Sequence, residues 1–215
     1  MTSRVLVLHG LWNARSWVAP LALRLRREGF DTRIYGYASI FGGPDAAIPA
    51  LIERLREGEP VNLVGHSLGG LIALEALRRE PSLPVPRLVC IGSPLSGSRT
   101  AAALAARAWL APVLGRSRAL LQRGCQPWTG PTEIGMVAGN VPRGVGRLLA
   151  CLEGDSDGTV AVSETRLPGL RDHCVVPASH SGLVLSREAA AQTACFLRQG
   201  RFASDPALGG AGALE

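Results

Sequence analysis

Short runs of apolar residues alternate along this chain with longer stretches in which apolar residues recur at helical spacing. The runs predict strands over residues 4–9, 31–37, 61–65, 87–92, 134–138 and 173–177, and the longer stretches predict helices over residues 20–28, 45–57, 68–79 and 187–199. The first strand is a continuous Val/Leu run, which is typical of a parallel strand buried on both faces. Strands that alternate with helices in this way predict βαβ units around a parallel sheet.

A long segment after the fourth predicted strand interrupts this alternation. Residues 93–132 are rich in Arg, Gly and Pro, and we interpret them as irregular or helical. The chain shows no internal repeat and no linker, so we predict one α/β domain over residues 1–203, a three-layer, doubly wound, mostly parallel sheet of about six strands. Residues 95–132 are the candidate lid, and the Gly/Ala-rich residues 204–215 are predicted to be a disordered tail.

Composition places the chain among globular proteins. Of its 215 residues, 47% are hydrophobic and 19% are charged, which excludes a chain that stays disordered for lack of apolar residues. No apolar run reaches the roughly 18 residues of a membrane span, and the opening residues lead directly into a strand too short for a secretory signal. Five cysteines without paired or metal-ligand spacing favour a reducing compartment, with Cys125 expected to be the exposed one. We therefore expect a cytoplasmic protein.

The chain is basic, with a net charge of +6, and every basic residue is arginine. Many arginines lie beside acids in helical stretches, as in the Glu-Arg-Leu-Arg-Glu run at residues 53–57. Nucleic-acid-binding proteins gather their basic residues on one face or in one run. The spread of charge favours solvated helix faces, and we expect no nucleic-acid partner.

The strongest chemical signal is the sequence Gly-His-Ser-Leu-Gly-Gly at residues 65–70. It contains the pattern G-x-S-x-G between a predicted strand and a predicted helix, which is the context of a nucleophile elbow. Small residues at positions 65 and 69 let the chain turn sharply and expose the Ser67 hydroxyl at the carboxyl edge of the sheet. The N-terminus of the following helix favours negative charge at the same place. The pattern predicts Ser67 as a nucleophile, and the alternative is an ordinary Gly-rich turn.

A serine hydroxyl needs a base to take its proton, and the chain has four histidines. His9 ends the first strand and is expected to brace the loop around Gly10, while His66 is expected to turn away from the adjacent serine. His173 begins the last strand, at the edge of the sheet opposite the carboxyl ends. His180 follows that strand and reaches the carboxyl edge. It is therefore our candidate general base, against the alternative of a surface-loop histidine.

An acidic residue has to orient the imidazole and stabilise its charged form. In hydrolases with such an elbow the chain order is Ser, acid, His, so the acid should follow the fifth strand and precede the base. The candidates are Glu153, Asp155, Asp157, Glu164 and Asp172. A polar turn at residues 155–160 interrupts an apolar context, and we predict Asp157 as the acid, with Asp155 second. The alternative for either is an Asp-Gly turn whose carboxylate binds its own backbone.

The tetrahedral intermediate of acyl transfer needs two backbone N–H donors. One is expected from Leu68, directly after the serine, and the other from the loop after the first strand, where Leu11 holds the matching position. Trp12 and Trp17 follow in the same loop. They either form the wall of an acyl pocket or pack against a helix.

A family resemblance rests on five segments. They are Val-Leu-His-Gly-Leu at residues 7–11, the elbow at 65–70, Ile-Gly-Ser-Pro-Leu-Ser-Gly-Ser at 91–98, Asp-Gly-Thr-Val at 157–160 and Ser-His-Ser-Gly-Leu at 179–183. From about residue 4 to about residue 200 the chain resembles the α/β-hydrolase superfamily, in particular small bacterial lipase or esterase-like and GPI-inositol-deacylase-like serine hydrolases. The resemblance implies Ser67 as nucleophile, Asp157 as acid and His180 as base, with the N–H groups of Leu11 and Leu68 as oxyanion donors.

The expected function is hydrolysis of carboxylic esters with apolar acyl chains, through a Ser-His-Asp triad and an acyl-enzyme, on a small-molecule or lipid ester. A thioesterase, an amidase or an acyltransferase would use the same residues, and a non-catalytic ligand-binding protein of this fold is the alternative outside enzymes. The chemistry requires no metal and no organic cofactor. The apolar residues 95–121 suggest a transient membrane-surface contact, against the alternative of a packed helix. The oligomeric state stays open.

Overall fold

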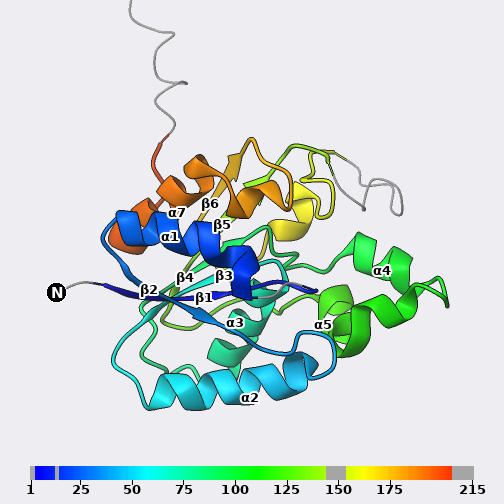
Figure 1. Cartoon of the computed structure of the whole chain (residues 1–215), viewed down its shortest axis with the longest axis horizontal. Helices are drawn as coiled ribbons and strands as arrows, with labels where there is room; N and C mark the ends of the chain where they lie inside the picture. Colours follow the sequence, from blue (N-terminus) through cyan, green and yellow to red (C-terminus); the bar gives the residue numbers. More distant parts are fainter. Residues whose placement is uncertain (1–2, 13–14, 144–153, 205–215) are drawn as a thin grey trace, which may run out of the picture.

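The computed structural model describes residues 3–12, 15–143 and 154–204 (Figure 1). Its centre is one six-stranded sheet, all parallel, with the order β2-β1-β3-β4-β5-β6. The strands are β1 (Arg4–Leu8), β2 (Asp31–Tyr35), β3 (Asn62–His66), β4 (Arg87–Ile91), β5 (Glu133–Gly139) and β6 (Asp172–Val176). The predicted fold class, a three-layer, doubly wound α/β fold around a six-stranded sheet, is confirmed.

Helices cover both faces of the sheet, and the strand side chains alternate between the faces. On one face lie α1 (Ala19–Arg27) and α7 (Arg187–Gln199), and on the other α2 (Gly43–Arg56) and α3 (Leu68–Arg79) (Figure 1). In β1, Val5 and Val7 belong to the core under α1 and α7, while Leu6 and Leu8 belong to the core with α2 and α3. A strand buried on both faces has no solvated side, which explains its uninterrupted Val/Leu run.

The predicted helix and strand boundaries agree with the structure to within two residues, including those of α2, which contains a proline. It starts at Gly43, earlier than predicted, and continues through Pro49 to Arg56. A proline inside a helix removes one backbone hydrogen bond and clashes with the preceding turn. The helix persists because its neighbours Ile48 and Leu51 are fully buried in the core against the sheet. A short 3-10 helix, η1 (Arg15–Val18), also precedes α1 without a counterpart among the predicted elements.

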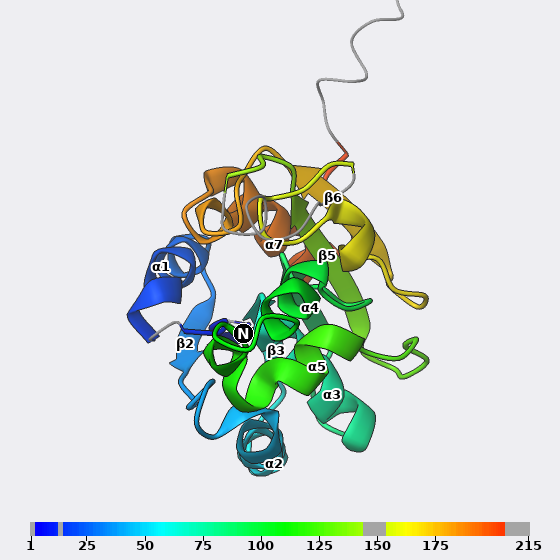
Figure 2. The same ribbon diagram turned by 90° about the vertical axis from the view of Figure 1, so that its right-hand side faces the viewer.

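The predicted excursion at residues 95–132, which we call the cap, folds over the carboxyl edge of the sheet. It contains α4 (Arg99–Ala105), the 3-10 helix η2 (Ala111–Ser117) and α5 (Arg118–Arg123). Figure 2 looks onto α4 and α5, which lie in front of the ends of the central strands. Leu114, Leu120 and Leu121 are buried in the same core as α2 and α3. The cap is therefore packed onto the main core.

Cys125 is buried, and the expectation that it is the exposed cysteine is wrong. It follows Gly124, whose φ of +68° ends α5 and turns the chain back over the core. Its N–H donates to the carbonyl of Leu95, and its thiol lies against the carbonyl of Leu71 on α3. Burial raises the pKa of the Cys125 thiol, so this cysteine stays protonated at neutral pH.

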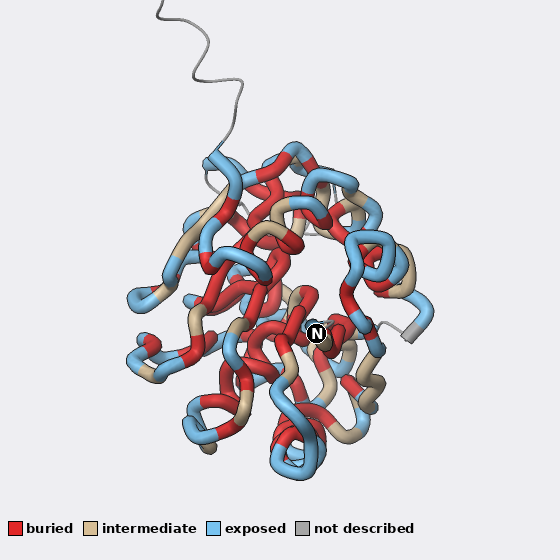
Figure 3. Tube along the Cα trace, turned by 90° about the vertical axis from the view of Figure 1, so that its left-hand side faces the viewer, coloured by how far each residue is buried: buried red, intermediate tan, exposed pale blue. Residues whose placement is uncertain are grey.

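Burial divides the molecule into a closed interior and exposed turns. Figure 3 looks at the amino ends of the strands, with buried segments through the middle and exposed turns around them. In the part of the chain that the structure describes, no helix is long and apolar enough to cross a membrane. Residues 205–215, which hold nearly all of the predicted tail, lie outside the described residues.

Candidate active site

Ser67 lies at a sharp turn between β3 and α3. Its φ of 55° and ψ of −122° fall in a region that residues with a side chain rarely adopt. A Cβ on Gly65 would lie 2.4 Å from the nitrogen of Gly70, and a Cβ on Gly69 would lie 2.7 Å from the carbonyl oxygen of His9. The turn therefore needs glycine at both positions, which is the physical content of the G-x-S-x-G pattern.

The structure brings together the three side chains that the sequence singles out. His180 Nε2 lies 3.0 Å from the Ser67 hydroxyl oxygen, and His180 Nδ1 lies 2.6 Å from Asp157 Oδ2. The loops after β6 and β5 carry the histidine and the aspartate to the edge where β3 delivers the serine. The N–H of His180 also donates to the carbonyl of Asp157 at 2.9 Å, which ties the two loops together. The result is a continuous hydrogen-bonded chain of three side chains.

Asp157 uses its two carboxylate oxygens for different tasks. Its Oδ1 accepts hydrogen bonds from the N–H groups of Thr159 at 2.9 Å and Val160 at 2.7 Å, while Oδ2 faces His180. The side chain is only 1% exposed, so these donors replace the water that a buried carboxylate loses. Asp155, the second candidate, is exposed. Asp157 therefore fits both interpretations, the acid beside the histidine and the turn residue that binds its own backbone. One carboxylate oxygen binds the turn, and the other remains for the imidazole.

His66 is a second imidazole close to the first. Its ring is fully buried, with the centroid 5.0 Å from that of His180, and its Nε2 lies 3.1 Å from the carbonyl oxygen of His180. Nε2 donates this bond, and Nδ1 has no hydrogen-bond partner among the described residues. Burial, followed by the nearby His180, lowers the pKa of His66 to about 3. His66 therefore holds the loop of His180 while adding no positive charge next to it.

The loop after β1 is braced by His9, as expected. Its Nδ1 lies 2.9 Å from the Gly10 carbonyl, and its Nε2 lies 3.3 Å from the N–H of Tyr37, on whose ring it stacks at 4.4 Å. Leu11 follows and lines the same cavity as Ser67. Leu68 is the first residue of α3, where backbone N–H groups have no helical acceptor. The two predicted oxyanion donors therefore belong to segments that border Ser67, with Leu11 in the loop after β1 and Leu68 at the start of α3.

A cavity of about 400 Å³ with mostly apolar walls opens beside Ser67. The cap contributes two polar lining residues, Ser98 and Thr100, and six apolar ones, which are Ala101, Leu104, Leu110, Val113, Leu114 and Leu121. Trp12 and Trp17 also line the cavity. The indole N–H of Trp12 donates to the carbonyl of Val113 at 2.6 Å, so the loop after β1 and the cap are joined at the wall.

The cap is anchored to the rest of the molecule at two points along its length. At its start, the N–H of Arg99 donates to the buried carboxylate of Glu164 at 2.6 Å. Near its middle, the hydroxyl of Ser117 donates to the carbonyl of Ser39 at 2.7 Å. Glu164, one of the acid candidates, thus holds the cap, and its other carboxylate oxygen accepts the N–H of Ala161 at 2.8 Å. A movement of the whole cap would have to break both of these bonds together.

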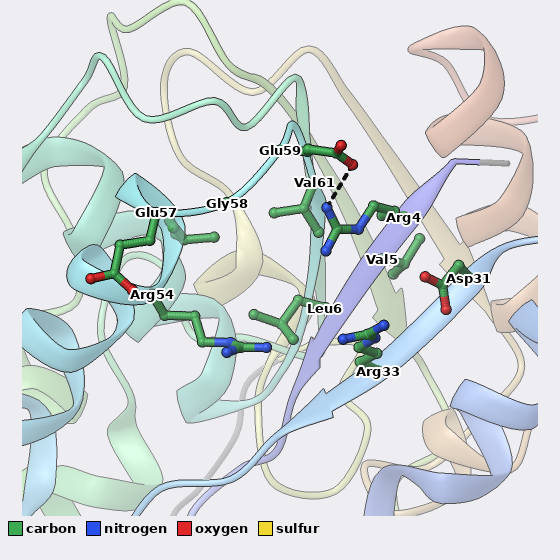
Figure 4. A pocket seen from close by; sticks show the side chains of 11 residues that line it. Arg4, Val5, Leu6, Asp31, Arg33, Arg54, Glu57, Gly58, Glu59 and Val61 are labelled. Atoms are coloured by element: carbon green, nitrogen blue, oxygen red, sulfur yellow. Dashed lines mark hydrogen bonds and ion pairs between the residues drawn. The ribbon is translucent and has the colours of Figure 1, made fainter. Parts of the chain in front are cut away.

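A second cavity, of about 220 Å³, opens at the amino edge of the sheet (Figure 4). Charged side chains of both signs line it: Arg4, Arg33, Arg54, Asp31, Glu57 and Glu59. Arg4 and Glu59 form an ion pair at 3.0 Å. Its lining residues include no serine, cysteine or histidine, so this cavity offers no nucleophile.

The remaining histidine lies far from the serine in the sheet, as its position in the sequence predicts. His173 follows the first residue of β6, and its Nε2 lies 2.8 Å from the hydroxyl of Thr165. Within the described ranges, no group of three or more His, Cys, Asp or Glu side chains could hold a metal ion. Of the four histidines, His180 is the one bonded to Ser67, whereas His9, His66 and His173 each have a ring nitrogen bonded to another partner.

Comparisons with known proteins bear on the fold. Phospholipase PlaB from Legionella pneumophila has a similar structure, with a TM-score of 0.65 and 15% identity over 93% of this chain and 57% of that chain. The type II thioesterase BorB from the borrelidin biosynthetic cluster has a TM-score of 0.57 and 19% identity over 92% of each chain. An N-formylmaleamic acid deformylase from Pseudomonas putida has a TM-score of 0.59 and 16% identity over 91% of this chain and 92% of that chain.

These identities are too low to carry more than the fold, and this chain spans little more than half of the phospholipase. No curated protein matches the chain in sequence. The model of the alpha/beta hydrolase family, however, matches residues 5–201. The chain therefore belongs to the alpha/beta hydrolase family.

Proposed function

We propose that this protein is a serine hydrolase that cleaves carboxylic esters with apolar acyl chains. The observation that carries the proposal is the hydrogen-bonded chain from Ser67 through His180 to Asp157, placed at a cavity with apolar walls. A serine hydroxyl bonded to an imidazole, which is itself held by a buried carboxylate, is activated as a nucleophile.

In the first half of the reaction, Ser67 Oγ attacks the carbonyl carbon of the ester while its proton moves to His180 Nε2. The electron pair of the carbonyl bond moves to the oxygen, and the N–H groups of Leu11 and Leu68 stabilise this oxyanion. The intermediate then collapses, the bond to the alcohol oxygen breaks, and His180 returns the proton to the leaving alcohol. The acyl group stays on Ser67 as an ester.

In the second half, water takes the place of the serine. His180 removes a proton from water as it attacks the acyl-enzyme, and the second tetrahedral intermediate releases the acid and restores the Ser67 hydroxyl. The positive charge on His180 exists only between these proton transfers. Asp157 stabilises that charge at 2.6 Å, and its own burial leaves little water to screen the attraction.

The substrate class follows from the walls of the cavity. Leu104, Val113 and Leu121 are the surfaces that an acyl chain would contact, and each buried methylene contributes about 0.8 kcal/mol. We expect kcat/KM to rise with acyl length until the cavity is full. A thioester of the same acyl group would occupy the same space, and the named thioesterase shares the fold over 92% of each chain. Thioester hydrolysis is therefore the second candidate.

Steady-state hydrolysis of a matched substrate set tests the proposal. The set contains p-nitrophenyl esters of increasing acyl length, with the thioester and the anilide of the best acyl group. Wild type should hydrolyse the esters with an optimum in acyl length, and Ser67→Ala should lose at least about 10³-fold in kcat/KM. Turnover of the thioester alone would make the protein a thioesterase. Folded wild type that turns over no member of the set would support the non-catalytic alternative.

A further inference from the structure

The cap carries most of the net positive charge of the protein. Residues 95–132 contain five arginines and no aspartate or glutamate, so this segment supplies five of the six units of net charge. The arginines are Arg99, Arg107, Arg116, Arg118 and Arg123, and all five are exposed. The rest of the chain, with 18 basic against 17 acidic residues, is close to neutral. The charge that looks spread along the sequence is concentrated in space over the carboxyl edge of the sheet.

Three large aromatic side chains are exposed around the same segment. Phe41 is 86% exposed, Trp109 is 78% exposed and Trp12 is 61% exposed. Trp109 lies in the cap just before η2, and Trp12 is bonded to Val113 within η2. Phe41 directly follows the residue whose carbonyl accepts the N–H of Arg116. The three residues are therefore all next to one short helix, η2.

The combination of features has a specific physical meaning. Exposed tryptophan and phenylalanine side chains are unfavourable in water but favourable at the level of lipid headgroups, where arginines attract anionic lipids. Residues 36–44, which lead into the first turn of α2, carry no charge, and Asp45 is the first acid that follows them in the sequence. Trp12 both lines the cavity beside Ser67 and reaches the surface, so the mouth of this cavity lies next to η2.

We propose that the docking rim, formed by Trp12, Phe41, Trp109, Arg116 and Arg118, places the protein on an anionic phospholipid surface with the cavity mouth toward the lipid. The inference stands independently of the proposed hydrolysis, because it uses charge and exposure and no catalytic step. A fluid interface accepts protruding aromatic side chains without shaped pockets, whereas a protein partner would have to supply a matching pocket for each. The shape of the rim thus favours lipid over an acidic protein.

Flotation with vesicles tests the proposal on full-length protein carrying Ser67→Ala, which cannot alter the lipid by hydrolysis. One vesicle set is phosphatidylcholine alone, and the other is an equimolar mixture with phosphatidylglycerol. We expect binding to the mixed vesicles, a loss on addition of salt, and little binding to phosphatidylcholine. Arg116→Gln with Arg118→Gln should weaken binding about 25-fold, at about five-fold per arginine. Phe41→Ser with Trp109→Ser should weaken it by at least about ten-fold.

Two matched variants make the result specific to the rim. Arg33→Gln with Arg54→Gln removes the same charge at the amino edge, and Leu23→Ser removes an exposed apolar side chain from α1. Both should leave vesicle binding unchanged. Equal loss in the amino-edge variant would reduce the effect to overall charge and overturn the proposal. Binding of the protein to poly-glutamate, without binding to either vesicle set, would also overturn the proposal, because the rim would then bind an acidic protein.

Discussion

The two edges of the sheet hold cavities of opposite character. At the amino edge, Arg4 and Glu59 pair at 3.0 Å with side chains that are 34% and 82% exposed, so water screens their attraction. At the carboxyl edge, Asp157 is fully buried and meets His180 at 2.6 Å beside apolar walls. Charged groups are present at both edges. Only at the carboxyl edge is a carboxylate buried away from water and bonded to an imidazole that faces a serine.

The topology explains this difference. Because all strands are parallel, loops that leave the strands meet at the carboxyl edge, together with the positive end of α3 after Ser67. The amino edge receives the other ends of the helices, and Arg54 and Arg56 lie in the last turn of α2, where cations stabilise a helix. Arg54 of the charged cavity therefore has a structural explanation at the end of α2, whereas the buried carboxylate and imidazole beside the apolar cavity face a serine.

The largest expected effect separates the two edges directly. His180→Ala should lower kcat/KM for the best ester by about 10⁴-fold or more, because no other group takes the serine proton. Arg54→Ala at the amino edge should change it by less than about two-fold. Initial rates for both variants, with circular dichroism to show that each is folded, check the contrast. Similar losses in both would show that the chemistry does not depend on the carboxyl edge.

The acid offers the next contrast, within a single turn. Asp157→Asn should lower kcat/KM about 10³-fold or more, because an amide cannot stabilise the charged imidazole. Asp155→Asn, two residues away and exposed, should stay within about two-fold of wild type. The measurement is kcat/KM for both variants at neutral pH. A larger loss for Asp155→Asn than for Asp157→Asn would show that Asp155, and not Asp157, is the acid.

His66 gives the carboxyl edge a pH dependence of stability. Its pKa falls from 6.5 to about 3 on burial, so the unfolded chain binds more protons as the pH drops through this window. The free energy of unfolding should therefore decrease by about 2 kcal/mol from this residue between pH 7 and pH 5. His66→Gln keeps a donor for the His180 carbonyl but does not titrate, and its urea midpoint should depend less on pH. Parallel curves for variant and wild type would contradict this account.

The smallest expected effect concerns the apolar wall. Leu104→Phe adds volume to the partly buried wall of the cavity, and it should shift the optimum to shorter acyl chains. We expect about a ten-fold loss on the longest ester and little change on acetate. Leu23→Phe, an equal change on the surface of α1, is the control. An unchanged acyl-length profile in Leu104→Phe would mean that the acyl chain binds elsewhere.

Local patterns in the sequence predicted the sheet and the elbow, since β1 is a buried Val/Leu run and the turn at Ser67 needs its flanking glycines. Contacts between distant segments could not be predicted in this way. The bond from His66 to the His180 carbonyl joins residues 114 positions apart, and that from Trp12 to Val113 joins residues 101 positions apart.

Predictions from neighbouring residues in the sequence were also wrong where packing against distant segments determines the environment of a residue. The Gly-Cys-Gln-Pro run at residues 124–127 is typical of an exposed turn, yet α5 folds Cys125 against α3. The cap arginines lie far enough apart in the sequence to look dispersed, and the fold brings the segment that carries them over the carboxyl edge of the sheet. The residues next to a position in the sequence therefore predict its secondary structure better than they predict which distant residues will surround it.

Reaction with a fluorophosphonate tests the central claim most directly, because the reagent modifies a serine only where a base activates it. Intact-mass analysis followed by peptide mapping would be done on wild type, Ser67→Ala and His180→Ala. The account predicts a single adduct on Ser67 of wild type, none on Ser67→Ala and a strongly slowed reaction in His180→Ala. No adduct on folded wild type, or an adduct on another serine, would contradict it.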